Sequence, residues 1–283
     1  LGRGAMGYPM AGHLQRAGFD VTVYKRNPAK AQTWVEEFGG RSATNPSLAV
    51  QGADIVLACV GNDDSLREVT YGENGAFQGM KIDSIFVDHT TTSAEVAKEV
   101  AAQAQARGLH FIDAPVSGGQ AGAINGVLTV MCGGEESAFN RAKPVIDTFA
   151  RSVVLLGPHG SGQLCKMVNQ ICIAGLVQGL AEAIAFGERT GLDMKQVLDV
   201  VSKGAAQSWQ MENRGPTMLQ NKFDFGFAVD WMRKDLGLVF DEAKRNGAKL
   251  PVTELVDSFY AQIQENGNNR MDTSSLITLL KKA

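Results

Sequence analysis

The sequence lacks the features that identify several classes of protein. Its four cysteines form no C-x-x-C pair and its four histidines do not cluster, so we expect no bound metal. Basic residues are not in excess, since 27 Lys and Arg stand against 30 Asp and Glu, and a net charge of −3 argues against nucleic-acid or anionic-membrane partners. A membrane span is not expected either, because the most apolar long stretch, residues 164–186, contains Lys166, Asn169, Gln170, Gln178 and Glu182.

The composition is that of a soluble globular protein, with 44% apolar and 20% charged residues. The cysteines are scattered among apolar neighbours, which is typical of reduced thiols, so we expect a cytoplasmic protein. Strand-like apolar runs alternate with helical patterns through about residue 157, and this alternation predicts βαβ units with a mostly parallel sheet. The expected strands are 20–25, 54–60, 84–88, 109–114, 127–132 and 153–156. The expected helices are 9–16, 29–38, 93–106 and 135–149.

Beyond Gly157-Pro158 the periodicity is helical, without a convincing strand. Residues 161–190 fit one helix of about 30 residues, which is longer than usual in globular proteins and suits a link between two domains. Shorter helices are expected at 194–203, 229–246 and 251–266, and from Thr273. We therefore predict an α/β fold, with a sheet domain over residues 1–160 that is followed by an all-helical domain over 161–283.

A glycine-rich loop opens the chain. Gly2, Gly4 and Gly7 fit G-x-G-x-x-G, and a helix and a strand follow in the order that a Rossmann-type dinucleotide-binding unit requires after its first strand. We expect that first strand to precede the given sequence. Such glycines let a pyrophosphate approach the helix N-terminus, so we expect the loop, including Ala5 and Met6, to hold the cofactor. The alternative is a glycine turn that only packs the helix against the sheet.

The identity of the cofactor is indicated by a missing acid. The second strand of such units normally ends in Asp or Glu, which binds the ribose 2′-OH of NAD, whereas Lys25 and Arg26 stand there and would pair with a 2′-phosphate. We therefore expect NADP rather than NAD, with a solvated basic pair as the alternative. Val60, Asn62 and Thr91 follow later strands and are further candidates for cofactor binding, because ligands of open α/β sheets bind at the carboxyl ends of the strands.

Lys166 is the strongest candidate for proton transfer. It lies near the start of the long apolar helix, with Asn169 and Gln170 at i+3 and i+4 on the same face. A lysine is seldom buried unless it has a partner or a task, and desolvation brings the pKa of an ammonium toward the range of a general acid. The alternative is a lysine at a helix start whose ammonium group reaches water.

A turn after the strand at 109–114 is a candidate substrate site. The stretch DAPVSGG places a proline and two glycines behind that strand. Ser117, Gly118 and Gly119 can present a hydroxyl and two backbone N–H groups to a carboxylate. A glycine turn with a capping serine explains the same residues equally well.

Four segments, residues 1–11, 113–134, 160–170 and 231–238, carry a family resemblance together. In this order and at this spacing they closely resemble the β-hydroxyacid dehydrogenases, across essentially the whole chain. The resemblance implies an NADP(H)-dependent oxidoreductase that interconverts a small carboxylate-bearing β-hydroxyacid and its semialdehyde by hydride transfer, with Lys166 as general acid/base. The substrate class includes 3-hydroxyisobutyrate, tartronate semialdehyde, glyoxylate and succinic semialdehyde, and the choice among them is open.

The resemblance also implies roles for single residues. The turn at 117–119 would hold the substrate carboxylate, and Lys234 would contact the cofactor. Many relatives have Asn-Asn where this chain has Asn169-Gln170, so the shape of the pocket is open at that point. Relatives form oligomers, and a homodimer or homotetramer is expected. The implied substrate neighbours in the helical domain are Asn169, Gln170, Phe227 and Asp235.

Two alternatives remain open. One is a non-catalytic, NADP-binding oligomerisation module of the same fold, and the other is an enzyme like the imine reductases. Known examples of both generally lack a lysine at the position of Lys166, which argues against them.

Overall fold

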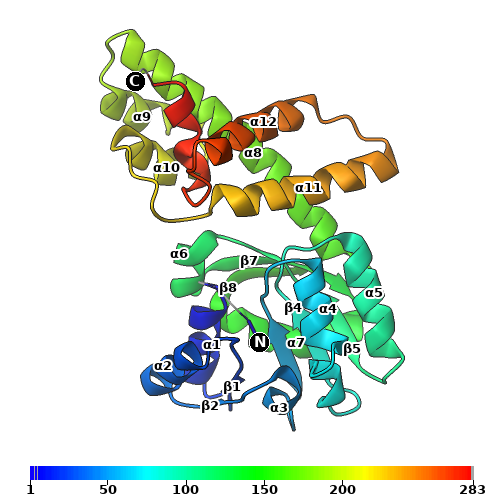
Figure 1. The fold of residues 1–283 in the computed structure, drawn as a ribbon. Coiled ribbons are helices and arrows are strands. Elements are labelled where there is room, and N and C mark those ends of the chain that lie inside the picture. The colour runs from blue at the N-terminus through cyan, green and yellow to red at the C-terminus, as the bar shows by residue number, and fades with distance from the viewer. Residues whose placement is uncertain (3, 5, 282–283) are drawn as a thin grey trace. The chain divides into compact units, whose positions relative to one another are not determined.

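Strands alternate with helices up to Leu155, and only helices follow among the described residues (Figure 1). The computed structural model describes residues 1–281 apart from Arg3 and Ala5. Its contacts divide it into the units Leu1–Lys166 and Met167–Ala283, and the chain passes from one to the other within α8 (Ser161–Arg189). The predicted α/β fold with a helical C-terminal part and a long connecting helix is confirmed.

The first unit contains a sheet of mostly parallel strands. The order across it is β3-β4-β5-β7-β6, and β8 pairs with β7 as well. The pairs β3–β4, β4–β5 and β7–β8 are parallel, whereas β7 runs antiparallel to β5 and β6. The bounds are β3 (Ile55–Ala58), β4 (Ile85–Asp88), β5 (His110–Asp113), β6 (Val116–Ser117), β7 (Leu128–Gly134) and β8 (Ala150–Leu155). A separate parallel pair consists of β1 (Thr22–Val23) and β2 (Arg41–Ser42).

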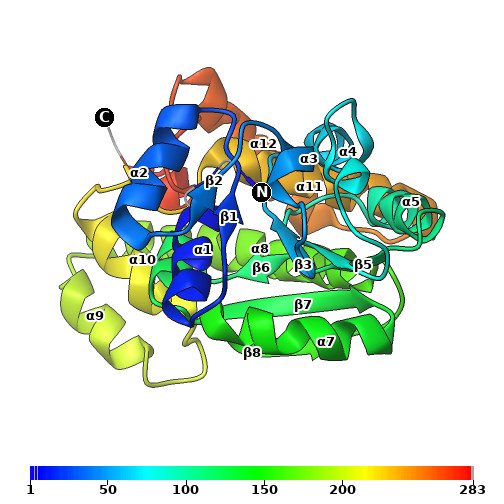
Figure 2. The same cartoon turned by 90° about the horizontal axis from the view of Figure 1, so that it is seen from below.

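Successive side chains of a strand point to opposite faces, and β4 shows how this divides the core. Its Ile85 and Val87 pack with side chains of α1 (Gly7–Arg16) and α7 (Glu136–Ile146). Its Phe86 packs instead with α4 (Asp63–Tyr71) and α5 (Ala94–Gln105), so helices cover both faces of the sheet (Figure 2). The unit also contains α2 (Pro28–Phe38), α3 (Pro46–Ala49), η1 (Ala76–Gln78), α6 (Gly119–Ile124) and η2 (Asp147–Phe149).

The second unit is built around the remainder of α8. Ala174, Val177, Ala181 and Ile184 recur at intervals of three and four residues, and all four are buried in the helical core. By length and composition α8 could cross a membrane, but 50% of its most apolar window is buried inside the structure, as in a core helix. The other helices are α9 (Met194–Val201), α10 (Trp209–Leu219), α11 (Val229–Asn246), α12 (Pro251–Glu265) and η3 (Thr273–Leu279).

One stripe of α8 carries apolar side chains at the surface. Leu164, Val168 and Leu176 are 38%, 60% and 46% exposed, and their numbers differ by multiples of four, which places them on one side of the helix. Exposed apolar stripes of this kind are common at subunit interfaces. The expected homodimer or homotetramer stays a prediction.

Candidate active site

The glycine-rich loop meets the end of β3. Gly2 donates its N–H to Tyr24 O (3.2 Å) and Cys59 donates its N–H to Leu1 O (2.9 Å), so the start of the chain lies between the backbones that follow β1 and β3. A Cβ on Gly2 would lie 2.4 Å from Cys59 O, so packing alone requires glycine there. Among the atoms of the described residues, the nearest to a Cβ on Gly4 is Met6 N, at 3.7 Å. These residues therefore leave room at Gly4 that a closely approaching ligand would use.

The helix α1 begins directly behind this loop. Its N-cap, Met6, makes no side-chain hydrogen bond to the helix, and the first turn, whose residues are all described, carries no acid. The first N–H groups and the positive end of the helix dipole therefore have no competing anion from this turn. These features fit the pyrophosphate of a dinucleotide. Ala5, which was predicted to bind beside Met6, lies outside the described residues.

Lys25 and Arg26 follow β1 at the position predicted for a 2′-phosphate. The Lys25 Nζ atom lies 4.9 Å from the centre of the Tyr8 ring. Partial burial, and then the charge of Lys30, lowers the pKa of Lys25. Arg26 lies 4.0 Å from Glu68 in a loose, exposed pair that a stronger anion could replace. The contact of these two cations with a 2′-phosphate stays a prediction.

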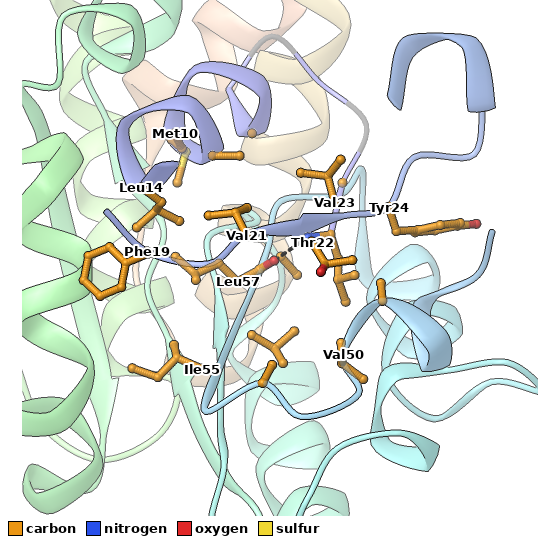
Figure 3. A pocket seen from close by; sticks show the side chains of 18 of the residues that line it. Met10, Leu14, Phe19, Val21, Thr22, Val23, Tyr24, Val50, Ile55 and Leu57 are labelled. Atoms are coloured by element: carbon orange, nitrogen blue, oxygen red, sulfur yellow. Dashed lines mark hydrogen bonds between the residues drawn. The ribbon is translucent and has the colours of Figure 1, made fainter. Parts of the chain in front are cut away.

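A cavity of about 500 Å³ lies between β1 and β3 (Figure 3). The side chains that line it are mainly apolar, among them Met10, Leu14, Val21 and Leu57. Such walls do not favour a phosphate or a carboxylate, because burying a charge among apolar groups is strongly unfavourable. We therefore assign neither the cofactor pyrophosphate nor the substrate carboxylate to the apolar part of this cavity, whose lining also includes Lys25, the predicted contact of a 2′-phosphate.

The loops behind β3 and β4 are held together by hydrogen bonds. Val60 donates its N–H to Thr90 Oγ1 (2.9 Å). Asp63 accepts both the N–H and the hydroxyl of Ser93, at 3.0 and 2.6 Å. Val60 and Thr91, which are both predicted to contact the cofactor, therefore lie in two loops that meet at the carboxyl edge of the sheet.

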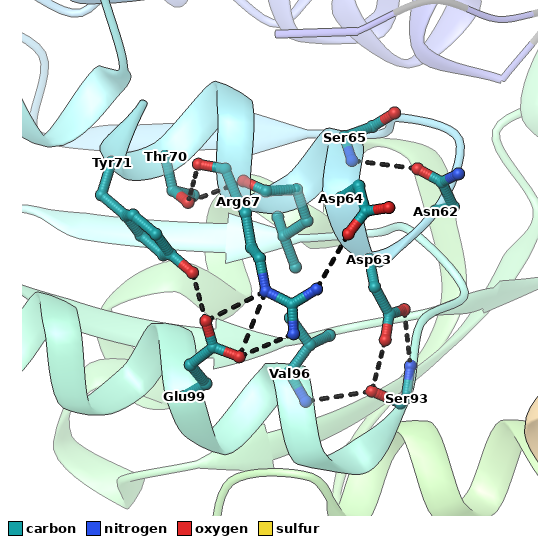
Figure 4. Close-up of polar contacts among 11 residues, drawn as sticks. Asn62, Asp63, Asp64, Ser65, Arg67, Thr70, Tyr71, Ser93, Val96 and Glu99 are labelled. Carbon is teal, nitrogen blue, oxygen red and sulfur yellow. Dashed lines mark hydrogen bonds and ion pairs between the residues drawn. The ribbon is translucent and has the colours of Figure 1, made fainter. Parts of the chain in front are cut away.

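The helices α4 and α5 reinforce this edge (Figure 4). Asn62 begins α4 by accepting the N–H of the third following residue. Farther along, the Arg67 guanidinium binds both carboxylate oxygens of Glu99 (3.0 and 2.7 Å), and Tyr71 donates its hydroxyl to the same carboxylate. Arg67 also binds Asp64 (3.0 Å). Bidentate charge-assisted pairs fix direction as well as distance. They therefore hold α4, whose N-cap is Asn62, firmly against α5.

The turn at 117–119 begins with the last residue of β6. Ser117 is paired with Thr129 of β7. Gly118 and Gly119 have φ angles of 128° and 62°, which only glycine adopts without strain. A Cβ on Gly119 would meet no described atom within 4 Å, so the turn presents backbone to open space. This geometry suits a carboxylate site, and the predicted contacts of the three residues stay predictions.

Buried polar groups anchor the first turn of α8. Asp113, at the end of β5, accepts the N–H groups of Gly160 (2.7 Å) and Gln163 (3.0 Å). Burial raises the pKa of Asp113 to about 6, and these hydrogen bonds oppose the rise. Gly162 lies so close to β7 that a Cβ would stand 2.4 Å from Met131 O. The start of the helix therefore cannot shift freely against the sheet.

Lys166 lies one turn beyond this anchor. It is only 7% exposed. Such burial is rare for lysine, and it was expected of the predicted proton donor. Ser117 follows Asp113 by four residues, so one strand end leads both to the anchored helix and to the glycine turn. The predicted proton donor and the predicted carboxylate site are therefore both connected to the end of β5, the first through the hydrogen bonds of Asp113 and the second through the chain.

In the second unit a polar group joins α8 to α11. Asn169 Nδ2 donates to Gln170 Oε1 (2.7 Å), and Gln170 Nε2 donates to Asp235 Oδ2 (2.7 Å). Lys234 Nζ lies 2.9 Å from the other oxygen of Asp235, which is 2% exposed. Four predicted site residues are therefore linked. The longer side chain of Gln170, whose effect on the pocket was open, reaches the buried carboxylate of Asp235.

The loop before α11 carries Phe227, which packs against the helical core. Its N–H donates to Asp272 Oδ2 (2.9 Å), and the buried Asp272 also pairs with Arg214 (3.0 Å). Asp272 and Arg214 were not predicted, because they are remote in the sequence from the loop they fix.

His89, in the loop behind β4, is a buried histidine whose ring is hydrogen-bonded to the backbone. Its Nδ1 atom donates to Ala114 O (2.7 Å), and burial lowers its pKa to about 4. The ring is therefore neutral near pH 7, and its position is fixed by the backbone that follows β5.

Comparison with known proteins identifies the family. Residues 1–157 match the family described as the NAD binding domain of 6-phosphogluconate dehydrogenase. Residues 160–280 match the family described as NAD-binding of NADP-dependent 3-hydroxyisobutyrate dehydrogenase. A Shewanella frigidimarina protein described as an uncharacterized oxidoreductase is 60% identical over 100% of this chain and 97% of its own length.

Two further relatives have assigned activities. The 2-hydroxy-3-oxopropionate reductase of Escherichia coli is 32% identical, over 99% of this chain and 96% of its own. The solved structure of Mycobacterium tuberculosis 3-hydroxyisobutyrate dehydrogenase with L-serine is 30% identical, with a TM-score of 0.88 and coverage of 99% of this chain and 97% of the other. The protein is therefore an NAD(P)-dependent dehydrogenase or reductase acting on CH–OH groups, and it belongs to the β-hydroxyacid dehydrogenase family.

Proposed function

We propose that the protein is an NADP(H)-dependent enzyme that interconverts a small β-hydroxyacid and its semialdehyde, with Lys166 as general acid/base. The observation that carries this proposal is the buried ammonium of Lys166, on a helix start that Asp113 anchors to the carboxyl edge of the sheet. Ligands of open α/β sheets bind at that edge. A buried charge placed there is a candidate for chemistry, because burial of a lysine does not favour folding.

The chain's own residues would position the substrate and move the proton. When bound, the nicotinamide cofactor supplies a hydride to the substrate carbon or accepts one from it. In reduction Lys166 gives a proton from Nζ to the carbonyl oxygen, and in oxidation it takes the proton of the hydroxyl. The turn at 117–119 holds the carboxylate, so that the reacting carbon stands at a fixed distance.

Two observations favour NADP over NAD in this proposal. Lys25 and Arg26 follow β1 where NAD enzymes of this fold carry an acid. The family that matches residues 160–280 is described as NADP-dependent. For the substrate, the names of the two relatives with assigned activities point to 2-hydroxy-3-oxopropionate and 3-hydroxyisobutyrate, which both pair a carboxylate with a carbon that can be oxidised or reduced.

The remaining predicted contacts belong to the second unit. Lys234 contacts the cofactor, and the other polar residues of the linked group contact the substrate. Phe227 supplies an apolar wall. These substrate residues are Asn169, Gln170 and Asp235.

The test is an absorbance assay of the reduced nicotinamide. Purified protein is supplied with 2-hydroxy-3-oxopropionate, glyoxylate or succinic semialdehyde, and in the other direction with 3-hydroxyisobutyrate. Each is measured with both cofactors. We expect turnover in the panel and a kcat/KM for NADPH about tenfold or more above that for NADH, the effect of one charge-assisted hydrogen bond. Tight binding of NADPH without turnover of any compound would contradict the proposed reaction.

The role of Lys166 is tested by Lys166→Met, which keeps the length of the side chain and removes the proton donor. We expect kcat to fall by about two to four orders of magnitude while the Kd for NADPH is retained. The exposed Lys203→Met is the matched control. Wild-type kcat in Lys166→Met would remove Lys166 from the chemistry.

A further inference from the structure

Gln163 is a polar side chain without any exposed surface, and none of the roles above uses it. Its Oε1 accepts the N–H of Thr92 (3.0 Å), and its Nε2 donates to the carbonyl of Thr90 (2.8 Å). Its own N–H donates to Asp113 (3.0 Å). One residue in the first turn of α8 therefore binds the loop behind β4 and the end of β5 together.

The side chain at position 163 serves two different backbone groups. Thr90 offers a carbonyl and Thr92 offers an N–H, so the partner must donate at one atom and accept at the other. A side chain of the same size without polar atoms would leave both backbone groups buried and unpaired, which is unfavourable. Packing alone does not explain glutamine at this position.

We propose that Gln163 is a positioning residue, which fixes Lys166 relative to the loop that carries Thr91. The inference rests on the proposed function, because it takes Lys166 as the proton donor and places Thr91 beside the cofactor. Lys166 follows Gln163 by three residues on a rigid helix, so the two hydrogen bonds to residues 90–92 set where its backbone stands.

The same hydrogen-bonded group reaches the loop behind β3. Thr90, whose carbonyl binds Gln163, accepts the N–H of Val60 at its hydroxyl (2.9 Å). Both loops predicted to contact the cofactor are therefore tied to the helix of the proton donor. A displacement of about 1 Å at reacting atoms slows an enzyme by about a hundredfold, so loosening this link should reduce kcat more than binding.

The first test uses two substitutions with opposite behaviour. Gln163→Met keeps the volume and removes both hydrogen bonds, and we expect kcat to fall about 10- to 100-fold at every pH, with the KM for NADPH within about threefold of wild type. In Gln163→Glu an ionised carboxylate would face the Thr90 carbonyl with a second acceptor. A protonated carboxyl donates and accepts as the amide does, so kcat relative to wild type should recover as the pH falls.

The second test needs no cofactor. Hydrogen exchange of the apo protein should be faster in Gln163→Met over residues 88–94 and 159–166, with wild-type rates in α12. The matched control is Gln178→Met, which alters a buried glutamine of the same helix whose amide donates to Glu182 instead. Its kcat and its exchange over both segments should equal those of wild type.

Several outcomes would overturn the inference. They are wild-type kcat in Gln163→Met, unchanged exchange in both segments, or a Gln163→Glu profile parallel to wild type. A buried carboxyl in Gln163→Glu also makes folding depend on pH, so the folded fraction of this variant is measured by circular dichroism at each pH and kcat is given per folded molecule. Wild-type kcat in Lys166→Met would instead refute the proposed function. A slow Lys166→Met beside a fast Gln163→Met refutes only the positioning role.

Discussion

Replacing Asp113 with asparagine should change how the stability of the first unit depends on pH. Burial raises the pKa of Asp113 from 3.8 to about 6, so the folded protein holds a proton over a pH range in which the unfolded chain has released it. A raised pKa contributes stability that is complete below the unfolded value and is lost as the pH rises through the folded value. Wild type should therefore gain stability from this group on acidification.

The size of the effect follows from the two values. The rise from 3.8 to about 6 corresponds to about 3 kcal/mol in full, of which about 2 kcal/mol develops between pH 7 and pH 4.5. Asparagine does not titrate, so the difference between wild type and Asp113→Asn isolates this contribution. At pH 7 the variant also loses one acceptor for the N–H groups of Gly160 and Gln163, at about 1–3 kcal/mol. Acidification from pH 7 to pH 4.5 should then stabilise wild type by about 2 kcal/mol relative to Asp113→Asn.

The assay is urea unfolding followed by tryptophan fluorescence. Trp34 is buried in the first unit (1% exposed), whereas Trp209 and Trp231 lie in the second unit and are 45% and 41% exposed. Substituting the latter two with phenylalanine leaves Trp34 as the reporter, which matters because two units need not unfold together. If wild type gains no stability relative to Asp113→Asn between pH 7 and pH 4.5, the reasoning is refuted.

Three other predictions use the same structural logic. His89→Asn keeps a donor for the Ala114 carbonyl. Because the pKa of His89 is lowered from 6.5 to about 4, wild type should lose about 2 kcal/mol of folding stability by pH 4.5, and the variant should not. The same loss of stability in the variant would contradict the assignment. Gly4→Ala should retain the Tm of wild type and raise the Kd for NADPH about tenfold or more. Gly2→Ala should lower Tm, because its Cβ would meet the backbone behind β3. A lower Tm in Gly4→Ala would mean that Gly4 is needed for packing. Arg26→Ala should raise the KM for NADPH about tenfold and leave that for NADH unchanged, and equal effects on both cofactors would exclude a 2′-phosphate contact.

Periodicity predicted the long helices well. The helix expected over 161–190 is α8, and the helix expected over 229–246 is α11, because several turns of apolar spacing leave little ambiguity. The helix α4 was missed, since its sequence is rich in charged residues and the Arg67–Glu99 pair ties it to a remote helix. The helix α10 was missed as well, and it contains Pro216 in its interior, which argues against a helix on local grounds.

Short strands were harder to predict for a related reason. The strand expected over 20–25 shortens to the two residues of β1, and β2 and β6 were not expected. A strand of two residues has no period, and its existence depends on a partner elsewhere in the chain. The turn at 117–119 was identified only because glycine and serine mark turns chemically.

Within the candidate site, motif residues could be named from the sequence but their supports could not. Lys166 could be named from the sequence because a lysine in an apolar helical stretch is unusual. Gln163 stands three residues before it in the same motif, yet its letter does not show that its amide binds residues 90–92. Asp272 is the parallel case in the second unit, where a remote carboxylate fixes the loop of Phe227.

The start of α8 departs from the rule that buried groups are apolar, and the departure has a physical reason. Asp113 and Gln163 are both 0% exposed, and apolar side chains of similar volume would bury the same area without a desolvation penalty. Apolar contacts, however, have little directional preference, whereas a donor and an acceptor that bind the backbone of residues 90–92 allow only one alignment of the two segments. A raised pKa at Asp113 shows that the fold is less stable near neutral pH than it would be with a neutral group there. Such an arrangement is expected where the position of a neighbouring group matters more than stability, and that neighbour is Lys166.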